Sequence, residues 1–214
     1  MMKWLAVTFA LFAGTAMADE TRLLNAAAQG NADIVAEEIA AGTPIDARST
    51  NGETALLLAT HGNHVAVAKM LIDAGADVNA KDRINDSPYL YAGARGHQEI
   101  LKATLAHGAD LASTNRFGGT ALIPAAERGH VETVRTLIAA GVDVNHVNRL
   151  GWTALMEAVV LSNGGPAHQQ IVSDLLAAGA DPNIPDKDGV TALAHARRMG
   201  QTQMAALIQK GGGR

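Results

Sequence analysis

Short apolar stretches recur along the chain, and their spacing predicts pairs of helices. In the segment 131–138, Val131, Val134 and Leu137 follow one another at intervals of three residues, so they share one face of a helix. A second kind of stretch, rich in Ala and Leu, comes before each of these, as in 54–59. A glycine or polar break separates the two stretches of each pair, at Gly30, Asn63, Gly96, Gly129 and Gly200. The pattern predicts an all-α chain of short helix–turn–helix elements.

Two sets of recurring residues show that these elements are repeats. A tract of the type Gly-Ala-Asp-Val-Asn begins at Gly75, Gly108, Gly141 and Gly179, at intervals of 33, 33 and 38 residues. This glycine is expected to end the second helix. The hydroxyl residues Thr21, Thr54, Ser87, Thr120, Thr153 and Thr191 follow the same period. Each hydroxyl group is expected to cap the start of the first helix. The predicted units are about 21–53, 54–86, 87–119, 120–152, 153–190 and 191–212.

Seven residues lie between the end of one unit's tract and the next hydroxyl residue, and they are rich in turn formers. They contain Gly52, Gly118, Gly151 or Gly189, which predicts a projecting turn or hairpin. The fifth unit carries five extra residues around 163–167, between its two helices. We expect a longer surface loop there.

The units resemble ankyrin repeats in three motifs. These are the Thr-Ala-Leu start, the Gly-His link at Gly96-His97 and Gly129-His130, and the Gly-Ala-Asp-Val-Asn end. The resemblance covers about residues 21–212 and implies an ankyrin-repeat solenoid with projecting hairpin or turn tips. It also implies a non-catalytic protein-binding module, whose concave face is formed by the turn tips and the exposed side of the first helices.

The first 18 residues have the layout of a cleaved secretory signal. Lys3 precedes an uncharged apolar run from Trp4 to Gly14, and Ala16-Met17-Ala18 offers a small-x-small cleavage site. Residues 19–214 then form a single repeat domain, and the protein is expected in the periplasm. No later apolar stretch is long enough to span a bilayer, for which about 20 residues are needed.

Composition and charge exclude several kinds of binding and covalent chemistry. The net charge of −4 gives no overall attraction to nucleic acid, and the absence of Cys excludes disulfides and thiolate metal sites. No cofactor is expected.

Four histidines occupy the same position in successive units, His64, His97, His130 and His168. Neighbouring helices pack about 8–10 Å apart, too far for these imidazoles to share one zinc ion, so they are interpreted as local hydrogen-bonding groups. One aspartate recurs in each of four units, and we interpret these residues as structural: Asp77, Asp110, Asp143 and Asp181. The protein is therefore not expected to be an enzyme.

Equivalent positions in successive units give the candidate binding residues. Four successive tips carry a cation, three of them with an apolar neighbour, and further arginines occur late in the first helices. The predicted protein-binding residues are Arg83, Ile84, Arg95, Arg116, Phe117, Arg128, Arg149, Leu150, Trp152 and Lys187. Arginine and aromatic side chains dominate binding hot spots, which favours a protein partner with an acidic or amphipathic surface. In the alternative, these side chains pack on neighbouring tips, and arginine stems cover apolar surface.

Several roles remain open at this point. The protein, a monomer when free, could support a periplasmic enzyme in stress defence such as peroxide defence. It could instead be an immunity-type inhibitor of a toxin. The alternative from another class is a metal-dependent or catalytic protein that uses the histidine column and the 163–167 segment.

Overall fold

A computed structural model describes residues 19–214, so the predicted signal peptide lies outside the described residues. Residues 19–29 are helical. The helices that follow are α2 (Ala32–Ala41), α3 (Ala55–His61), α4 (Val65–Asp73), α5 (Pro88–Arg95), α6 (Gln98–Ala106), α7 (Leu122–Glu127), α8 (Val131–Ala140), α9 (Ala154–Val160), α10 (Pro166–Ala177), α11 (Ala192–Arg198) and α12 (Thr202–Lys210). Over residues 19–214 there is no strand, only an isolated bridge between Arg48 and Thr54. The all-α prediction is confirmed.

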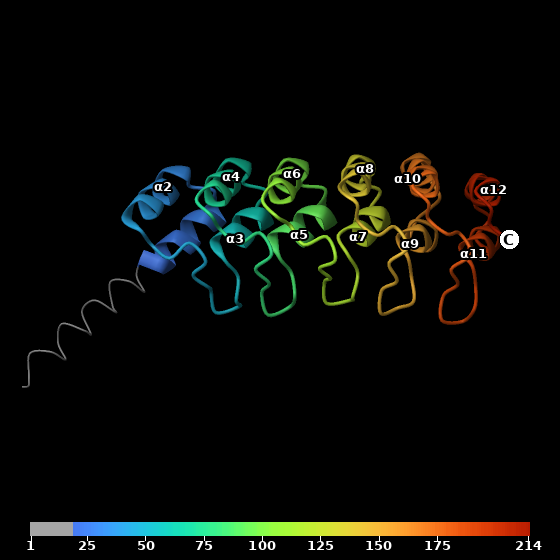
Figure 1. The fold of residues 1–214 in the computed structure, drawn as a ribbon, viewed down its shortest axis with the longest axis horizontal. Helices are drawn as coiled ribbons and strands as arrows, with labels where there is room; N and C mark the ends of the chain where they lie inside the picture. The colour runs from blue at the N-terminus through green and yellow to red at the C-terminus, as the bar shows by residue number, and fades with distance from the viewer. Residues whose placement is uncertain (1–18) are drawn as a thin grey trace, which may run out of the picture.

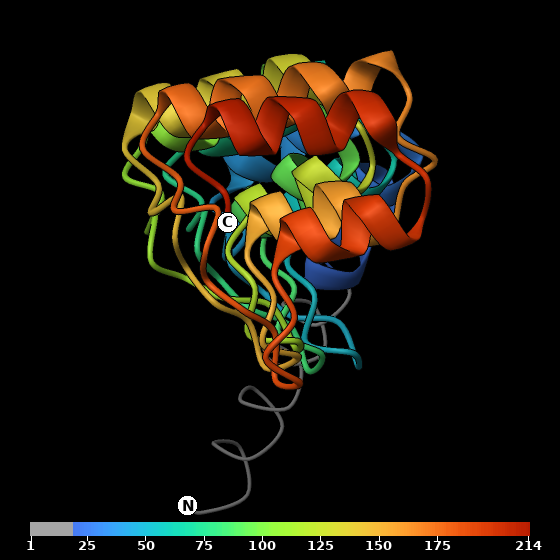
Figure 2. The ribbon, with the colours of Figure 1, turned by 90° about the vertical axis from the view of Figure 1, so that its right-hand side faces the viewer.

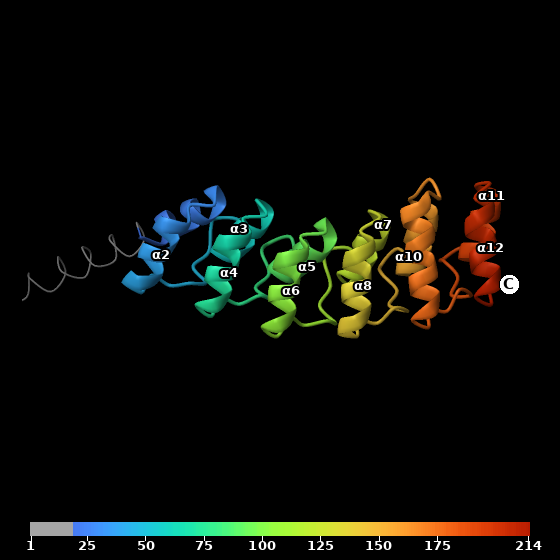
Figure 3. The same cartoon turned by 90° about the horizontal axis from the view of Figure 1, so that it is seen from above.

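The helices stack side by side in two layers (Figure 1). One layer contains α3, α5, α7, α9 and α11, and the other contains α2, α4, α6, α8, α10 and α12. Seen from above, successive helix pairs follow one another along the long axis (Figure 3). The connecting turns project together from one side of the two layers (Figure 2). This is the predicted solenoid, in which each unit packs on its neighbours.

A continuous apolar core lies between the layers. It is made of small and branched side chains, including the fully buried Leu56, Leu122 and Leu155. Tyr89 takes the equivalent position in its own unit and is also completely buried. Among residues 19–214, no helix is both long and apolar enough to cross a membrane.

Four of the six predicted helix caps are confirmed. The hydroxyl groups of Thr54, Ser87, Thr153 and Thr191 accept a hydrogen bond from the backbone N–H three residues later, at 3.2–3.4 Å. The prediction for Thr21 is wrong, because Thr21 lies inside the helix over residues 19–29. Gly141 ends α8 in the left-handed conformation, with φ of 92°, as predicted.

The predicted cap at Thr120 is also wrong, and Pro124 explains why. In the four units with a confirmed cap, the carbonyl group of the hydroxyl residue accepts from the N–H four residues later, as Thr153 does from Glu157. Pro124 has no N–H to donate, so the Thr120 carbonyl accepts from Ile123 at 3.3 Å instead. The helix α7 therefore starts late, at Leu122, and the buried Thr120 hydroxyl has no hydrogen-bond partner among residues 19–214.

The extra residues of the fifth unit lengthen a helix as well as a loop. Pro166 and Ala167 were predicted to lie in a loop, but both belong to α10, which has 12 residues where α8 has 10. Proline suits this first helical position, because its fixed φ fits the helix and its missing N–H would have no partner there. Gly165 precedes it as an extended N-cap residue.

Candidate protein-binding face

Each projecting turn is closed by one side chain that holds two backbone N–H groups. In the turn before α7, Asn115 Oδ1 accepts from the N–H groups of Phe117 and Gly119, at 2.9 and 3.1 Å. The equivalent residues of the five turns are Ser49, Asp82, Asn115, Asn148 and Asp186. This closure leaves the apolar tip residues in solvent, so that Ile84, Phe117 and Leu150 are 51, 54 and 51% exposed.

Two of the predicted tip cations hold neighbouring tips together. Arg149 donates to the carbonyl oxygen of Arg116 at 2.9 Å, and Lys187 donates to that of Arg149 at 2.5 Å. Their stems lie against turn glycines, since a Cβ added to Gly118 or Gly151 would come within 2.8 Å of their Cγ atoms. These contacts match the packing role that the sequence left open for the tip cations.

Arg116 differs from the other tip cations because of the turn before it. The position equivalent to Gly118 holds Asn85 there, in the left-handed conformation with φ of 63°. The Arg116 guanidinium lies 5.1 Å from the centre of the Phe117 ring and 3.4 Å from the Asp86 carboxylate. Arg116 therefore stands beside an exposed aromatic ring and is available to a partner.

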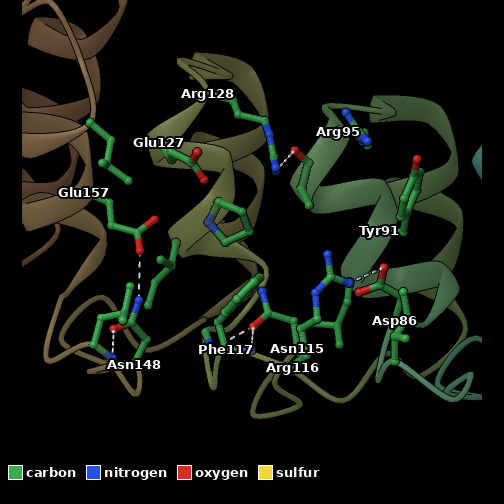
Figure 4. Close-up of a pocket in the computed structure, with 18 of the residues that line it drawn as sticks. Asp86, Tyr91, Arg95, Asn115, Arg116, Phe117, Glu127, Arg128, Asn148 and Glu157 are labelled. Carbon is green, nitrogen blue, oxygen red and sulfur yellow. Dashed lines mark hydrogen bonds and ion pairs between the residues drawn. The ribbon is translucent and has the colours of Figure 1, made fainter.

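A hollow of about 390 Å³ opens between the turns and the first helices (Figure 4). It is lined by residues of three consecutive turn–helix segments, 82–95, 115–128 and 148–161, and by His61. Six of the predicted binding residues line it, Ile84, Arg95, Arg116, Phe117, Arg128 and Leu150. The other four, Arg83, Arg149, Trp152 and Lys187, do not. Trp152 is half-buried and packs against the core.

Two small residues in the middle segment explain where the hollow forms. Gly119 stands where the flanking segments have Asp86 and Trp152. Pro124 stands where they have Tyr91 and Glu157. Pro124 is buried in the structure, and both residues of the middle segment line the hollow. Of the larger flanking side chains, Asp86, Tyr91 and Glu157 line the hollow, whereas Trp152 does not, and the space arises because the middle segment fills neither position.

Glu157 is a functional candidate that the sequence reasoning missed. Its side chain is only 6% exposed, and its Oε1 accepts a hydrogen bond of 2.8 Å from Asn148 Nδ2. Burial raises its pKa to about 7, and the nearby Glu127 adds to the rise, whereas Asn148 and Arg128 oppose it. The signal in the sequence was a lone carboxylate at a position held elsewhere by Leu58, Tyr91, Pro124 and His195.

The opposite side of the hollow is aromatic and basic. The rings of Tyr91 and His61 lie 4.3 Å apart, and the Arg95 guanidinium lies 5.3 Å from the centre of the Tyr91 ring. Burial raises the pKa of the Asp86 carboxyl group, although the Arg116 charge opposes this rise. Arg128 donates to the Ala94 carbonyl oxygen at 2.8 Å, which directs its guanidinium toward this side (Figure 4).

Three residues of the histidine column link their unit to the one before it. His64, His97 and His168 place a ring nitrogen 2.9–3.1 Å from carbonyl oxygens of Ala28, Thr60 and Glu127. Burial lowers the pKa of both His97 and His130. Over residues 19–214, no group of three or more His, Asp or Glu side chains is arranged to hold a metal ion.

Comparisons with known proteins agree with this architecture. The family model of ankyrin repeats in three copies matches residues 4–82 and 89–186. The chain is 61% identical to a solved ankyrin repeat domain from Acinetobacter baumannii, with a TM-score of 0.88 over 90% of this chain and 98% of that one. A second solved ankyrin repeat protein is 44% identical, with a TM-score of 0.86 over 89% and 98% of the two chains.

A match of lower sequence identity has the same fold. The ankyrin repeat domain of Bcl-3, a member of the IkappaB protein family, is 28% identical, with a TM-score of 0.80 over 90% of this chain and 86% of that one. No curated protein sequence matched the chain. Ankyrin repeats indicate a protein–protein interaction module. The chain belongs to the ankyrin-repeat family.

Proposed function

We propose that the protein is an exported, periplasmic, non-catalytic module that binds one protein partner over the hollow between segments 82–95, 115–128 and 148–161. The observation that carries this proposal is the meeting of exposed apolar and basic side chains at one concavity. Ile84, Phe117 and Leu150 stand in solvent at its edge, and Arg95, Arg116 and Arg128 line it. Exposed apolar surface of this kind marks sites of association.

The arginines give the partner its expected character. Arg116 and Arg95 each lie over an aromatic ring, which keeps the guanidinium group in place while its donors stay accessible. Acidic groups on the partner would meet these donors, and apolar groups would cover Phe117. The free protein is a monomer in this proposal, and its binding supports a periplasmic enzyme in stress defence.

Capture of the partner tests the proposal. The purified protein is cross-linked in a periplasmic extract of the organism that encodes it, in parallel with Phe117→Asp and Val147→Asp variants. Val147 is 44% exposed and does not line the hollow, so it controls for an added charge on an exposed tip. A partner captured by the wild type and by Val147→Asp, and lost from Phe117→Asp, is the expected result. Equal capture by all three would contradict the proposed face.

The effect of the protein on its partner's activity distinguishes the helper role from the inhibitor role. If the purified protein raises the activity or lifetime of the captured enzyme, it is a helper. If it abolishes a toxic activity, it is an immunity-type inhibitor, which would replace the helper role but leave the binding face intact. Cell fractionation and N-terminal sequencing test export. The protein is expected in the periplasmic fraction with residue 19 at its N-terminus.

A further inference from the structure

We propose that the hollow admits a lysine or arginine side chain of the partner, and that Glu157 forms an ion pair with this cation. The inference rests on the proposed function and adds a specificity that the arginine-lined edge does not reveal. The arginines favour acidic groups on the partner, whereas Glu157 requires a basic one.

The first argument is the incomplete bonding of a buried carboxyl group. Glu157 is 6% exposed, and Asn148 Nδ2 is its hydrogen-bond donor within the described chain. Oε1 takes that bond, and Oε2 makes none to any residue between 19 and 214. In Figure 4 the carboxyl group points into the hollow. Because Oε2 has no protein donor between residues 19 and 214, a cationic donor that arrives with the partner can form a charge-assisted hydrogen bond there, which is stronger than a neutral one.

The second argument is a neighbouring carboxylate without an ion pair. Glu127 lies on the same side of the hollow (Figure 4), and it forms no ion pair within the described residues. The nearby cation, Arg128, is turned toward segment 82–95 by its hydrogen bond to Ala94. A partner's cation between Glu127 and Glu157 would relieve the repulsion between the two carboxylates.

The hollow is therefore bipolar along the solenoid axis. Glu157 lies at one end, and Arg95 and Arg116 lie at the other (Figure 4). Arg116 starts from the middle segment, but its guanidinium group pairs with Asp86 of the first segment, on the side of Arg95. The partner segment that fits carries a basic residue at Glu157 and an acidic one toward Arg95 and Arg116, with an apolar residue between them over Phe117.

Selection of peptides tests this specificity without knowledge of the natural partner. A phage-displayed library of random peptides is selected on the wild-type protein and on the Glu157→Gln, Glu132→Gln and Phe117→Asp variants. Glu132 lies on α8, away from the hollow, and pairs with Arg135, so it is a matched loss of one carboxylate. The wild type and Glu132→Gln are expected to enrich peptides with Lys or Arg at a fixed position, and Glu157→Gln is expected to lose that preference.

Affinities of one selected peptide complete the test. Substitution of its basic residue by norleucine should weaken binding to the wild type by about tenfold or more, and should have little further effect on Glu157→Gln, because the two changes remove the same interaction. No enriched peptide, or the same basic preference on Glu157→Gln, would overturn the inference. Peptides that depend on Phe117 but not on Glu157 would overturn it and leave the proposed function standing, whereas dependence on neither residue would overturn both.

Discussion

The side-chain amide of Asn148 donates a 2.8 Å hydrogen bond to the carboxyl group of Glu157, nine residues later in the chain. The same Asn148 closes its turn by accepting from the N–H groups of Leu150 and Trp152. It therefore connects the exposed tip to the buried side of the hollow. In the sixth unit the equivalent pair, Asp186 and His195, makes the connection at 2.7 Å, with the carboxylate on the turn and its partner on the helix.

The position of Glu157 predicts a pH-dependent stability. Its pKa rises from 4.5 to about 7 on folding, so the folded protein binds the proton more tightly, and the contribution of this group to stability falls as the pH rises through this window. Glu157→Gln keeps an acceptor for Asn148 and removes the charge. We expect it to raise the free energy of unfolding by about 2 kcal/mol more at pH 8 than at pH 5.

Urea denaturation at the two pH values measures this effect. Glu132→Gln, which removes an exposed carboxylate, is the control and should show little difference between the two conditions. A Glu157→Gln variant that gains nothing at pH 8 would mean that water or a salt bridge already satisfies the carboxylate.

The unbonded hydroxyl group of Thr120 predicts opposite effects for two similar substitutions. Thr120→Val removes a buried hydroxyl that has no partner in the described part of the chain, so it should stabilise the protein by about 1 kcal/mol. Thr153→Val removes a cap that accepts from Met156, so it should destabilise the protein by about 1 kcal/mol. Both variants are followed by thermal unfolding. Equal losses at the two positions would show that Thr120 caps α7 after all.

Contacts between tips predict unequal costs for two glycine substitutions. Gly118 and Gly189 have nearly the same φ, 74° and 75°, so an alanine at either position pays about 1 kcal/mol for the left-handed conformation. At Gly118 the added methyl group would also meet Arg149 Cγ at 2.8 Å, whereas at Gly189 it would meet nothing within 4 Å. Gly118→Ala should therefore lose about 1 kcal/mol more than Gly189→Ala in chemical denaturation. Equal losses would mean that the tips are not packed on one another.

Two histidines are expected to resist protonation. Burial is the main cause that lowers the pKa of His97 and His130, and the charges of Arg95 and Arg128 add to it. Their ring C–H resonances in an NMR titration should shift at a pH below the ordinary value of 6.5. Because the unfolded chain binds these protons more readily, the two groups cost stability as the pH falls below 6.5. Titration at or above 6.5 would mean that these rings are solvated.

Local signals made much of the architecture predictable. The 33-residue period, the Ala/Leu runs and the hydroxyl residues each report on nearby backbone, and four of the hydroxyl groups form the expected caps. Thr120 failed because its cap depends on Pro124, where the decisive property is a missing N–H rather than a recognisable motif.

The hollow could not be predicted in the same way. It depends on the sizes of Gly119 and Pro124 relative to residues one repeat away on both sides, and thus on three-dimensional adjacency. Comparison of equivalent positions, in the tips and late in the first helices, located six residues that line it. It did not separate Arg116 from Arg149, because their different environments are determined by Asn85 and Gly118 in the preceding turns. Nor did it mark Glu157, whose burial follows from the packing of α9 against α7.

The arrangement of the hollow over three consecutive segments constrains how such a protein can evolve. Repeat arrays change length readily by duplication or loss of whole units. A unit gained or lost at either end would leave segments 82–161 untouched, whereas recombination inside them would separate Gly119 and Pro124 from Asp86 or from Glu157. Natural variants are therefore expected to differ in length at the ends of the array and to inherit its centre as one block.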